Sequence, residues 1–82
     1  MKKNIDLFKN FRKNIELLRI EKGLSTEEVA AKLRLSKKRV LDLEYGKYGR
    51  GTPKSEELFK IAKFFGVSVE DLVYKKAKVV LN

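Results

Sequence analysis

The sequence contains no cysteine, no histidine and no tryptophan. Without cysteine no disulfide can stabilise the fold, and without cysteine or histidine the usual structural zinc sites are excluded. A chain of 82 residues buries only about 60 to 65% of the surface that its unfolded form exposes. We therefore expect a single domain over residues 1–82 with one modest core, whose stability is marginal or shared with a partner.

Long apolar runs are also missing. No stretch approaches the roughly 20 apolar residues that are needed to cross a bilayer, and no signal peptide follows Lys2 and Lys3. The sequence is thus typical of a cytoplasmic protein. A peptide that binds a membrane surface is a weaker alternative, because the apolar faces of the predicted helices have to pack against one another in the core.

Histidine and cysteine, two residue types that are common in active sites, are both absent. There is also no glycine-rich phosphate loop of the Walker type. Three acidic pairs lie in first helical turns, where the helix dipole accounts for them: Glu27-Glu28, Glu56-Glu57 and Glu70-Asp71. We expect no enzyme activity, no catalytic residue, no cofactor and no metal ion.

Positive charge is abundant. Twenty Lys and Arg stand against eleven Asp and Glu, a net charge of +9. The excess is concentrated between residues 34 and 54, which contain Arg34, Lys37, Lys38, Arg39, Lys47, Arg50 and Lys54. Such a field attracts polyanions, and nucleic acid is the first candidate. The alternative is a basic surface that only keeps the protein in solution.

Hydrophobic spacing predicts a first helix over about residues 5–22. Its apolar stripe has spacings of three and four residues: Phe8, Phe11, Ile15 and Leu18. Asn4 or Asn10 is the candidate N-cap, and Gly23 is the expected terminator.

Three further helix starts follow one pattern, in which a serine lies between apolar residues that can close the entry as a hydrophobic staple. The serines are Ser25, Ser36 and Ser68, and they predict helices over 26–33, 37–45 and 69–74. Glu28 and Asp71, three residues after their serines, would complete capping boxes. The middle copy has Arg39 at this position, and its first turn carries Lys37, Lys38 and Arg39. Cations in a first turn oppose the helix dipole, so we expect a negatively charged partner to bind them. The alternative is that the lysines are solvated and lower the stability only slightly.

The remaining helix is expected over residues 53–65, with Thr52 as cap, Pro53 in the first helical position and Gly66 as terminator. Residues 75–82 lose helical spacing and form a short strand or a frayed tail. The prediction is an all-α, compact five-helix domain with a core over about 5–74 and a C-terminal extension.

The second and third helices are joined by only Arg34-Leu35-Ser36. Their inward positions are Val29, Ala30, Leu33, Leu35, Val40 and Leu43. Small Ala30 allows the two axes to cross closely, as a helix-turn-helix requires. The helix over 37–45 is then able to enter the major groove of DNA.

Motifs over residues 14–74 resemble the phage-repressor and Cro-like (Xre-type) helix-turn-helix domains. They are Asn14 to Arg19, Lys22-Gly23-Leu24-Ser25, Glu28-Val29-Ala30, Leu43-Glu44-Tyr45-Gly46-Lys47, Pro53, Leu58 to Ala62 and Gly66 to Leu72. The resemblance implies a lambda-repressor-like fold that binds double-stranded DNA. It also implies a structural ion pair between Arg19 and Glu44.

The resemblance further assigns candidate DNA contacts. Base-reading positions would be Ser36, Lys37, Lys38, Leu41 and Asp42. Backbone contacts would come from Thr26, Arg34, Arg39, Lys47, Arg50, Thr52 and Lys54. Alternatives stay open: Asp42 as a plain partner of Lys38, Leu41 as a core or dimer residue, and both lysines as phosphate contacts.

Two departures from the family pattern affect these contacts. Arg34 occupies the turn position where the family has glycine, and a non-glycine residue at positive φ costs about 1 kcal/mol. A slightly different path of the turn is one way to avoid that cost. The loop before Pro53 is also longer than is typical of the family.

The expected function is a sequence-specific transcriptional regulator that reads a palindromic operator as a homodimer. The alternatives are the antitoxin of a toxin-antitoxin pair, with a toxin as protein partner, and a restriction-modification controller. Two dimer surfaces are candidates: the last helix with Val69, Val73 and Tyr74, and the tail over 75–81.

Overall fold

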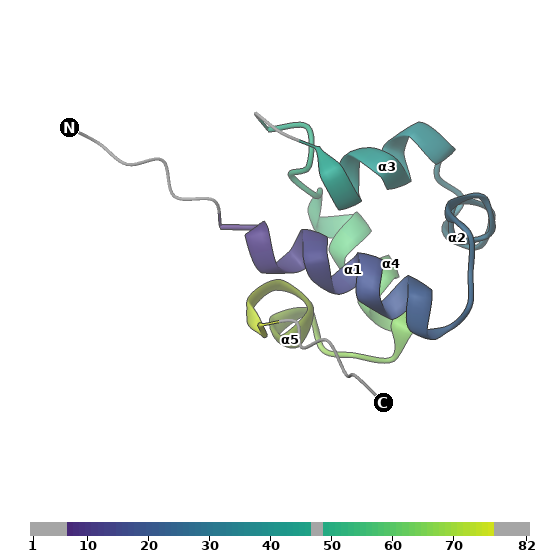
Figure 1. The fold of residues 1–82 in the computed structure, drawn as a ribbon. Coiled ribbons are helices and arrows are strands. Elements are labelled where there is room, and N and C mark those ends of the chain that lie inside the picture. Colours follow the sequence, from purple (N-terminus) through teal and green to yellow (C-terminus); the bar gives the residue numbers. More distant parts are fainter. Residues whose placement is uncertain (1–6, 47–48, 77–82) are drawn as a thin grey trace.

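The computed structural model describes residues 7–46 and 49–76 (Figure 1). This part of the chain contains five helices and no strand: α1 (Lys9–Glu21), α2 (Thr26–Leu33), α3 (Lys37–Tyr45), α4 (Ser55–Phe65) and α5 (Val69–Tyr74). The all-α prediction is confirmed, and the bounds of α2, α3 and α5 agree with the expected ranges. The first helix begins later than the expected residue 5, because Leu7 and Phe8 lie in a turn and Lys9 is the first helical residue.

A single core joins the helices. Phe11, Leu43, Ile61 and Leu72, from four different helices, are its largest fully buried side chains. α1 packs against α3 and α5, while α2 packs against α3 and α4. The inward positions of the helix pair α2 and α3 are buried, with Leu35 half-buried against the core. Burial of this apolar surface supplies the main stabilising free energy, since the chain has no cysteine.

The serine pattern sets the helix starts. The hydroxyl groups of Ser25, Ser36 and Ser68 each accept a hydrogen bond from the backbone amide three residues on, at 2.9 to 3.0 Å. At Ser25 the box is complete, because the Glu28 carboxylate accepts from the Ser25 amide at 2.9 Å. The expected box at Ser68 has only its serine half, since the Asp71 side chain is one methylene shorter than glutamate.

The start of α4 differs from the prediction. The N-cap is Lys54, so the helix begins two residues after Pro53, and Thr52 is not its cap. The Glu57 carboxylate accepts a hydrogen bond from the Lys54 amide at 2.8 Å, which fixes the start at this point. Pro53 is buried just before the helix instead of forming its first turn.

Asparagines of α1 hold the end of α5. Asn14 is buried and its side-chain amide donates to the carbonyls of Leu72 at 2.9 Å and Lys75 at 2.7 Å. Asn10 donates to the Tyr74 carbonyl at 3.3 Å. Asn10 is therefore not the cap of the first helix, whose N-cap is Phe8 without a side-chain bond. The other candidate cap, Asn4, lies outside the described residues.

Candidate nucleic-acid interface

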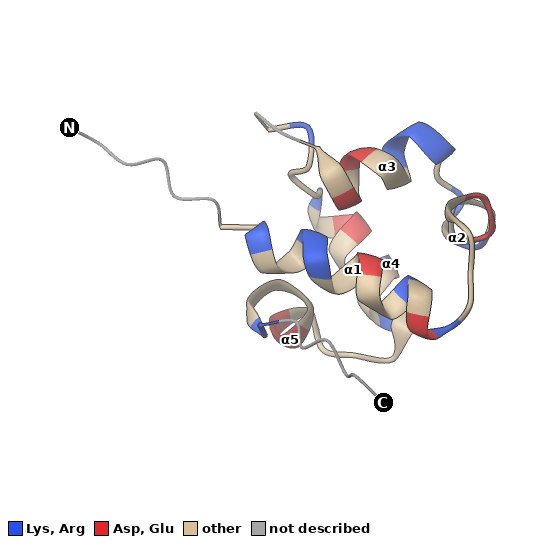
Figure 2. Cartoon of the chain, viewed as in Figure 1, with Lys and Arg blue, Asp and Glu red and all other residues tan. Residues whose placement is uncertain are grey.

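α3 lies along one edge of the molecule, in teal in Figure 1. Its inner side is buried through Val40 and Leu43, and its outer side is exposed. The exposed positions include Ser36, Lys37, Lys38, Leu41 and Tyr45. Lysine and arginine colour the N-terminal end of this helix in Figure 2, where no acidic residue occupies the first turn.

The turn that leads into α3 keeps the left-handed geometry of a helix C-cap. Arg34 has φ 57° and ψ 43°, and no other non-glycine residue in the described ranges has a positive φ. The Leu35 amide then bonds the Ala30 carbonyl at 2.9 Å. The turn therefore does not take a different path to avoid the missing glycine, and Arg34 carries the strain.

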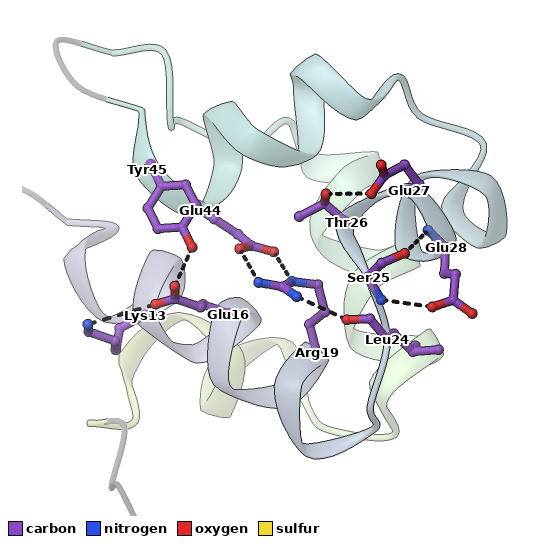
Figure 3. A network of polar contacts seen from close by, with 10 residues as sticks. All are labelled: Lys13, Glu16, Arg19, Leu24, Ser25, Thr26, Glu27, Glu28, Glu44 and Tyr45. Atoms are coloured by element: carbon purple, nitrogen blue, oxygen red, sulfur yellow. Dashed lines mark hydrogen bonds and ion pairs between the residues drawn. The ribbon is translucent and has the colours of Figure 1, made fainter.

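A bidentate ion pair joins the last turn of α3 to α1 (Figure 3). Arg19 donates from Nε and Nη2 to the Glu44 carboxylate at 2.8 and 3.1 Å, and from Nη1 to the Leu24 carbonyl at 2.9 Å. Both side chains are largely buried, and the carboxylate raises the pKa of Arg19. The pair explains the acid within the basic window as part of the scaffold.

A second bidentate pair joins the first turn of α3 to α4. Arg39 donates from Nε and Nη2 to the Glu57 carboxylate at 2.8 and 2.6 Å. Hydrogen bonding to Arg39 holds the pKa of Glu57 below its usual value, and the same bond raises the pKa of Arg39. Sequence reasoning placed Glu57 among dipole-complementing acids and Arg39 among the DNA-backbone contacts, and it missed their contact. One signal in the sequence pointed to this contact: the cations at the start of α3 call for a negative partner. For Arg39 that partner is Glu57 of the same chain.

The lysines on the outer side pair with an exposed carboxylate, Glu27, and a half-buried one, Asp42. Lys37 Nζ lies 3.2 Å from a Glu27 oxygen and Lys38 Nζ lies 3.4 Å from an Asp42 oxygen. Glu27 also accepts a hydrogen bond from the Thr26 hydroxyl at 3.1 Å. The pKa of Glu27 is lowered mainly by a backbone hydrogen bond and further by its bonds to Lys37 and Thr26. Contacts of this exposed kind are weak, so they can be exchanged for contacts with a ligand.

The chain after α3 folds back closely on the scaffold. A side chain at Gly46 would place its Cβ 2.6 Å from the Gly51 amide nitrogen, and a Cβ at Gly51 would lie 2.9 Å from the Arg12 side chain. Arg50, Thr52 and Lys54 are exposed. Lys47, the other expected backbone contact of this region, lies outside the described residues.

A helix-turn-helix family model matches residues 15–72, which is most of the chain. The protein belongs to this Xre-type helix-turn-helix family. The proteins to which it is similar are named as transcriptional regulators, transcription factors or repressors.

Two curated relatives of this helix-turn-helix protein are informative. An uncharacterized HTH-type transcriptional regulator from Methanocaldococcus jannaschii is 44% identical over 50 residues, which cover 61% of this chain and 71% of the relative. The transcriptional repressor RstR of the cryptic phage CTXphi from Vibrio cholerae is 40% identical over 63 residues, which cover 77% of this chain. The match spans 54% of the length of RstR, about half of that repressor.

Solved structures of similar fold are also transcription factors. A hypothetical transcription factor from Neisseria superposes with a TM-score of 0.71 at 28% identity, covering 83% of this chain and 75% of that one. A transcriptional regulator from Listeria innocua has a TM-score of 0.69 at 26% identity, covering 88% of this chain and 64% of the other. The five-helix fold of the helix-turn-helix protein is therefore that of known regulators.

No group of three or more Asp and Glu side chains in the described ranges is arranged to hold a metal ion. None of the helices in the described ranges is both long and apolar enough to cross a membrane.

Of the expected dimer residues on α5, Val73 is buried in the core of its own chain, whereas Tyr74 is exposed. Val73 is thus unsuited to an intersubunit contact, and the tail over 77–82 lies outside the described residues.

Proposed function

We propose that this helix-turn-helix protein is a cytoplasmic, sequence-specific transcriptional regulator that binds operator DNA with α3 in the major groove. The observation that carries the proposal is the division of α3 into two sides. Buried ion pairs at both ends of the helix fix its inner side, and exposed basic residues occupy its outer side. A rigid helix with a basic, accessible face fits the major groove in size and charge.

The base contacts follow from exposure on α3. The exposed amino groups of Lys37 and Lys38 can donate to guanine O6 and N7 after leaving their carboxylate partners. Leu41, 37% exposed, can pack on a thymine methyl group. Asp42 either accepts from cytosine N4 or remains the partner of Lys38. The Ser36 hydroxyl caps α3 and is also within the exposed face.

Backbone contacts are proposed on both sides of α3. On one side are Thr26 at the start of α2 and Arg34 in the turn. On the other side are the exposed residues after α3: Arg50, Thr52 and Lys54, with Lys47 between them and α3. Phosphate contacts of this kind position the protein on the duplex without reading sequence. They also make affinity fall steeply with salt.

A homodimer on a palindromic operator completes the proposal. One helix reads only a few base pairs, whereas two copies spaced by one turn of DNA, about 34 Å, double the number of bases read. The similarity to RstR, named as a transcriptional repressor, supports repression over activation.

Selection of random duplexes on the purified full chain tests the function. We expect enrichment of an inverted repeat that binds two chains, with affinity that falls as salt is raised. Replacement of Lys37 or Lys38 by alanine should cost about tenfold in affinity for the selected duplex and less for random duplex. Lys63→Ala, an exposed lysine on α4, is the matched control for loss of one charge. Equal losses on both duplexes would make the lysines phosphate contacts, and no enrichment would refute sequence-specific binding.

A further inference from the structure

The segment of residues 49–54, which carries the proposed backbone contacts, is held by arginines from two helices. Arg39 of α3 donates to the Arg50 carbonyl at 3.0 Å and to the Thr52 carbonyl at 2.9 Å. Arg12 of α1 donates to the intervening Gly51 carbonyl at 3.3 Å. Three successive backbone oxygens of the 49–54 segment are therefore bound to guanidinium groups of the scaffold.

Arg39 has little capacity left for DNA. Its guanidinium group has five N–H donors, and bonds to Glu57, Arg50 and Thr52 already use four of them. Its side chain is 24% exposed, and its charge is compensated by the buried Glu57 carboxylate. A direct phosphate contact, the role that the sequence suggested, would have to break part of this arrangement.

Glu57 ties the same arrangement to α4. One carboxylate oxygen accepts from Arg39 Nη2 at 2.6 Å and from the Lys54 amide at 2.8 Å. The 49–54 segment is thus fixed at its carbonyls by Arg39 and at its end by the cap of α4. Both fixed points meet at a single buried side chain, that of Glu57, which is 6% exposed.

We propose that Arg39 is a positioning residue, which fixes the 49–54 segment in the shape that contacts the DNA backbone. This inference rests on the proposed function. Carbonyl oxygens repel phosphate, and binding them to Arg39 turns them toward the protein while Arg50 and Thr52 stay exposed. A segment ordered before binding loses less conformational entropy on the duplex, which raises affinity.

The position of Arg39 also links two kinds of contact. It lies in the first turn of α3, directly after Lys37 and Lys38. Its bonds therefore hold the proposed base-reading face and the 49–54 segment in one rigid body. Lysine cannot replace it, because an ammonium group lacks the planar fork that reaches a carboxylate and two carbonyls together.

The test measures affinity for the duplex selected above, and its salt dependence, in six proteins. They are the full-length wild type, Arg39→Lys, Glu57→Gln, Glu56→Gln, Arg50→Ala and the double variant Arg39→Lys/Arg50→Ala. Glu56 is an exposed acid beside Glu57, so its variant makes the same charge change without a contact to Arg39. All measurements are made at a temperature where circular dichroism shows each protein to be fully folded.

We expect Arg39→Lys and Glu57→Gln each to weaken binding about fivefold, by loosening an ordered segment. Glu56→Gln should bind as tightly as the wild type or slightly more tightly. The effect of Arg39→Lys should be clearly smaller in the Arg50→Ala background, because one of the contacts that Arg39 positions is then already lost. Hydrogen exchange at the Thr52 amide, which bonds the Gly49 carbonyl at 3.2 Å, should be faster in Arg39→Lys.

Three results would overturn the inference. If Glu57→Gln binds more tightly than Glu56→Gln, Arg39 is itself a phosphate ligand that Glu57 restrains. If the losses from Arg39→Lys and Arg50→Ala add, the two residues act separately. If the Thr52 amide exchanges at the wild-type rate in Arg39→Lys, the segment does not depend on Arg39, and this last readout needs no DNA. Failure of the wild type to bind any duplex would instead refute the proposed function.

Discussion

The inner and outer sides of α3 both carry ion pairs, and the two sets differ in burial. On the inner side, Glu44 and Glu57 have side chains only 2% and 6% exposed, and each accepts two bonds from an arginine. On the outer side, Lys37 and Lys38 are 54% and 82% exposed, and each has a single carboxylate contact. Buried bidentate pairs define one geometry, whereas exposed lysine pairs are screened by water and easily exchanged. Charges on one helix can therefore have separate roles: the inner ones hold the helix in the fold, and the outer ones stay available to a ligand.

Breaking an inner pair should have the largest effect. Glu44→Gln leaves Arg19 without its buried counter-charge, and we expect a loss of about 3 kcal/mol in the free energy of unfolding. Urea denaturation of the full chain measures this loss. Asp42→Asn on the outer side of the same helix is the control and should change stability by only a few tenths of a kcal/mol. Equal changes in the two variants would contradict the distinction between the sides.

The second inner pair should make stability depend on pH. The pKa of Glu57 is lowered in the folded protein by its bond to Arg39, so its contribution is present above the unfolded pKa. That contribution is lost as the pH falls through the folded pKa. Glu57→Gln should therefore cost about 2 kcal/mol at neutral pH and flatten the loss of stability in acid. Thermal unfolding between neutral pH and acid measures both, with Glu56→Gln as control, and an unaltered acid profile would show that Glu57 is not the group that titrates.

The turn between α2 and α3 offers a change that separates stability from binding. Arg34→Gly removes a side chain from a left-handed conformation, φ 57°, and should raise the free energy of unfolding by up to about 1 kcal/mol. The same change removes a proposed phosphate contact, so the salt slope of DNA binding should fall by about one. Arg34→Lys keeps the charge and the strain, and should match the wild type in both measurements. Weaker folding of Arg34→Gly would show that the Arg34 side chain stabilises the turn.

The smallest expected effect is at an outer pair. Glu27→Gln releases Lys37 from a carboxylate and removes a negative charge beside the proposed phosphate contact Thr26. We expect DNA affinity to rise about two- to fivefold, with stability left nearly unchanged because the Glu27 side chain is exposed. The gain should disappear in a Lys37→Ala background, as measured by a double-mutant cycle. A gain that persists without Lys37 would assign the effect to general repulsion of DNA by Glu27.

The start of α4 and the partner of Arg39 show where sequence reasoning stopped. Ser25, Ser36 and Ser68 could be recognised as caps because a cap bonds an amide three residues away. The sequence predicts Thr52 as the cap of α4 because threonine followed by proline is typical of a helix start. What decided the start was Glu57, whose carboxylate also binds Arg39, 18 residues earlier in the chain. No local pattern contains that contact.

The candidate interface likewise has features that the sequence predicts and features that it does not. The position of α3 and the basic character of its outer face could be predicted from helical spacing and from the concentration of charge between residues 34 and 54. Two sets of contacts could not be predicted from the sequence. They are the pairing of Lys37 with Glu27 and the binding of the 49–54 segment by Arg12 and Arg39. These contacts join residues from different helices, and their geometry exists only when those helices are packed.

Caps, terminators and apolar spacing act over a few residues, so the five helices, their buried faces and the family resemblance could be predicted from the sequence alone. The tertiary structure decided which charges face inward, since that choice depends on which helices meet. Arg39 and Lys37 are both cations in one helical turn. Only the tertiary fold, which brings the first turns of α3 and α4 together, places Glu57 within reach of Arg39 and leaves Lys37 at the surface.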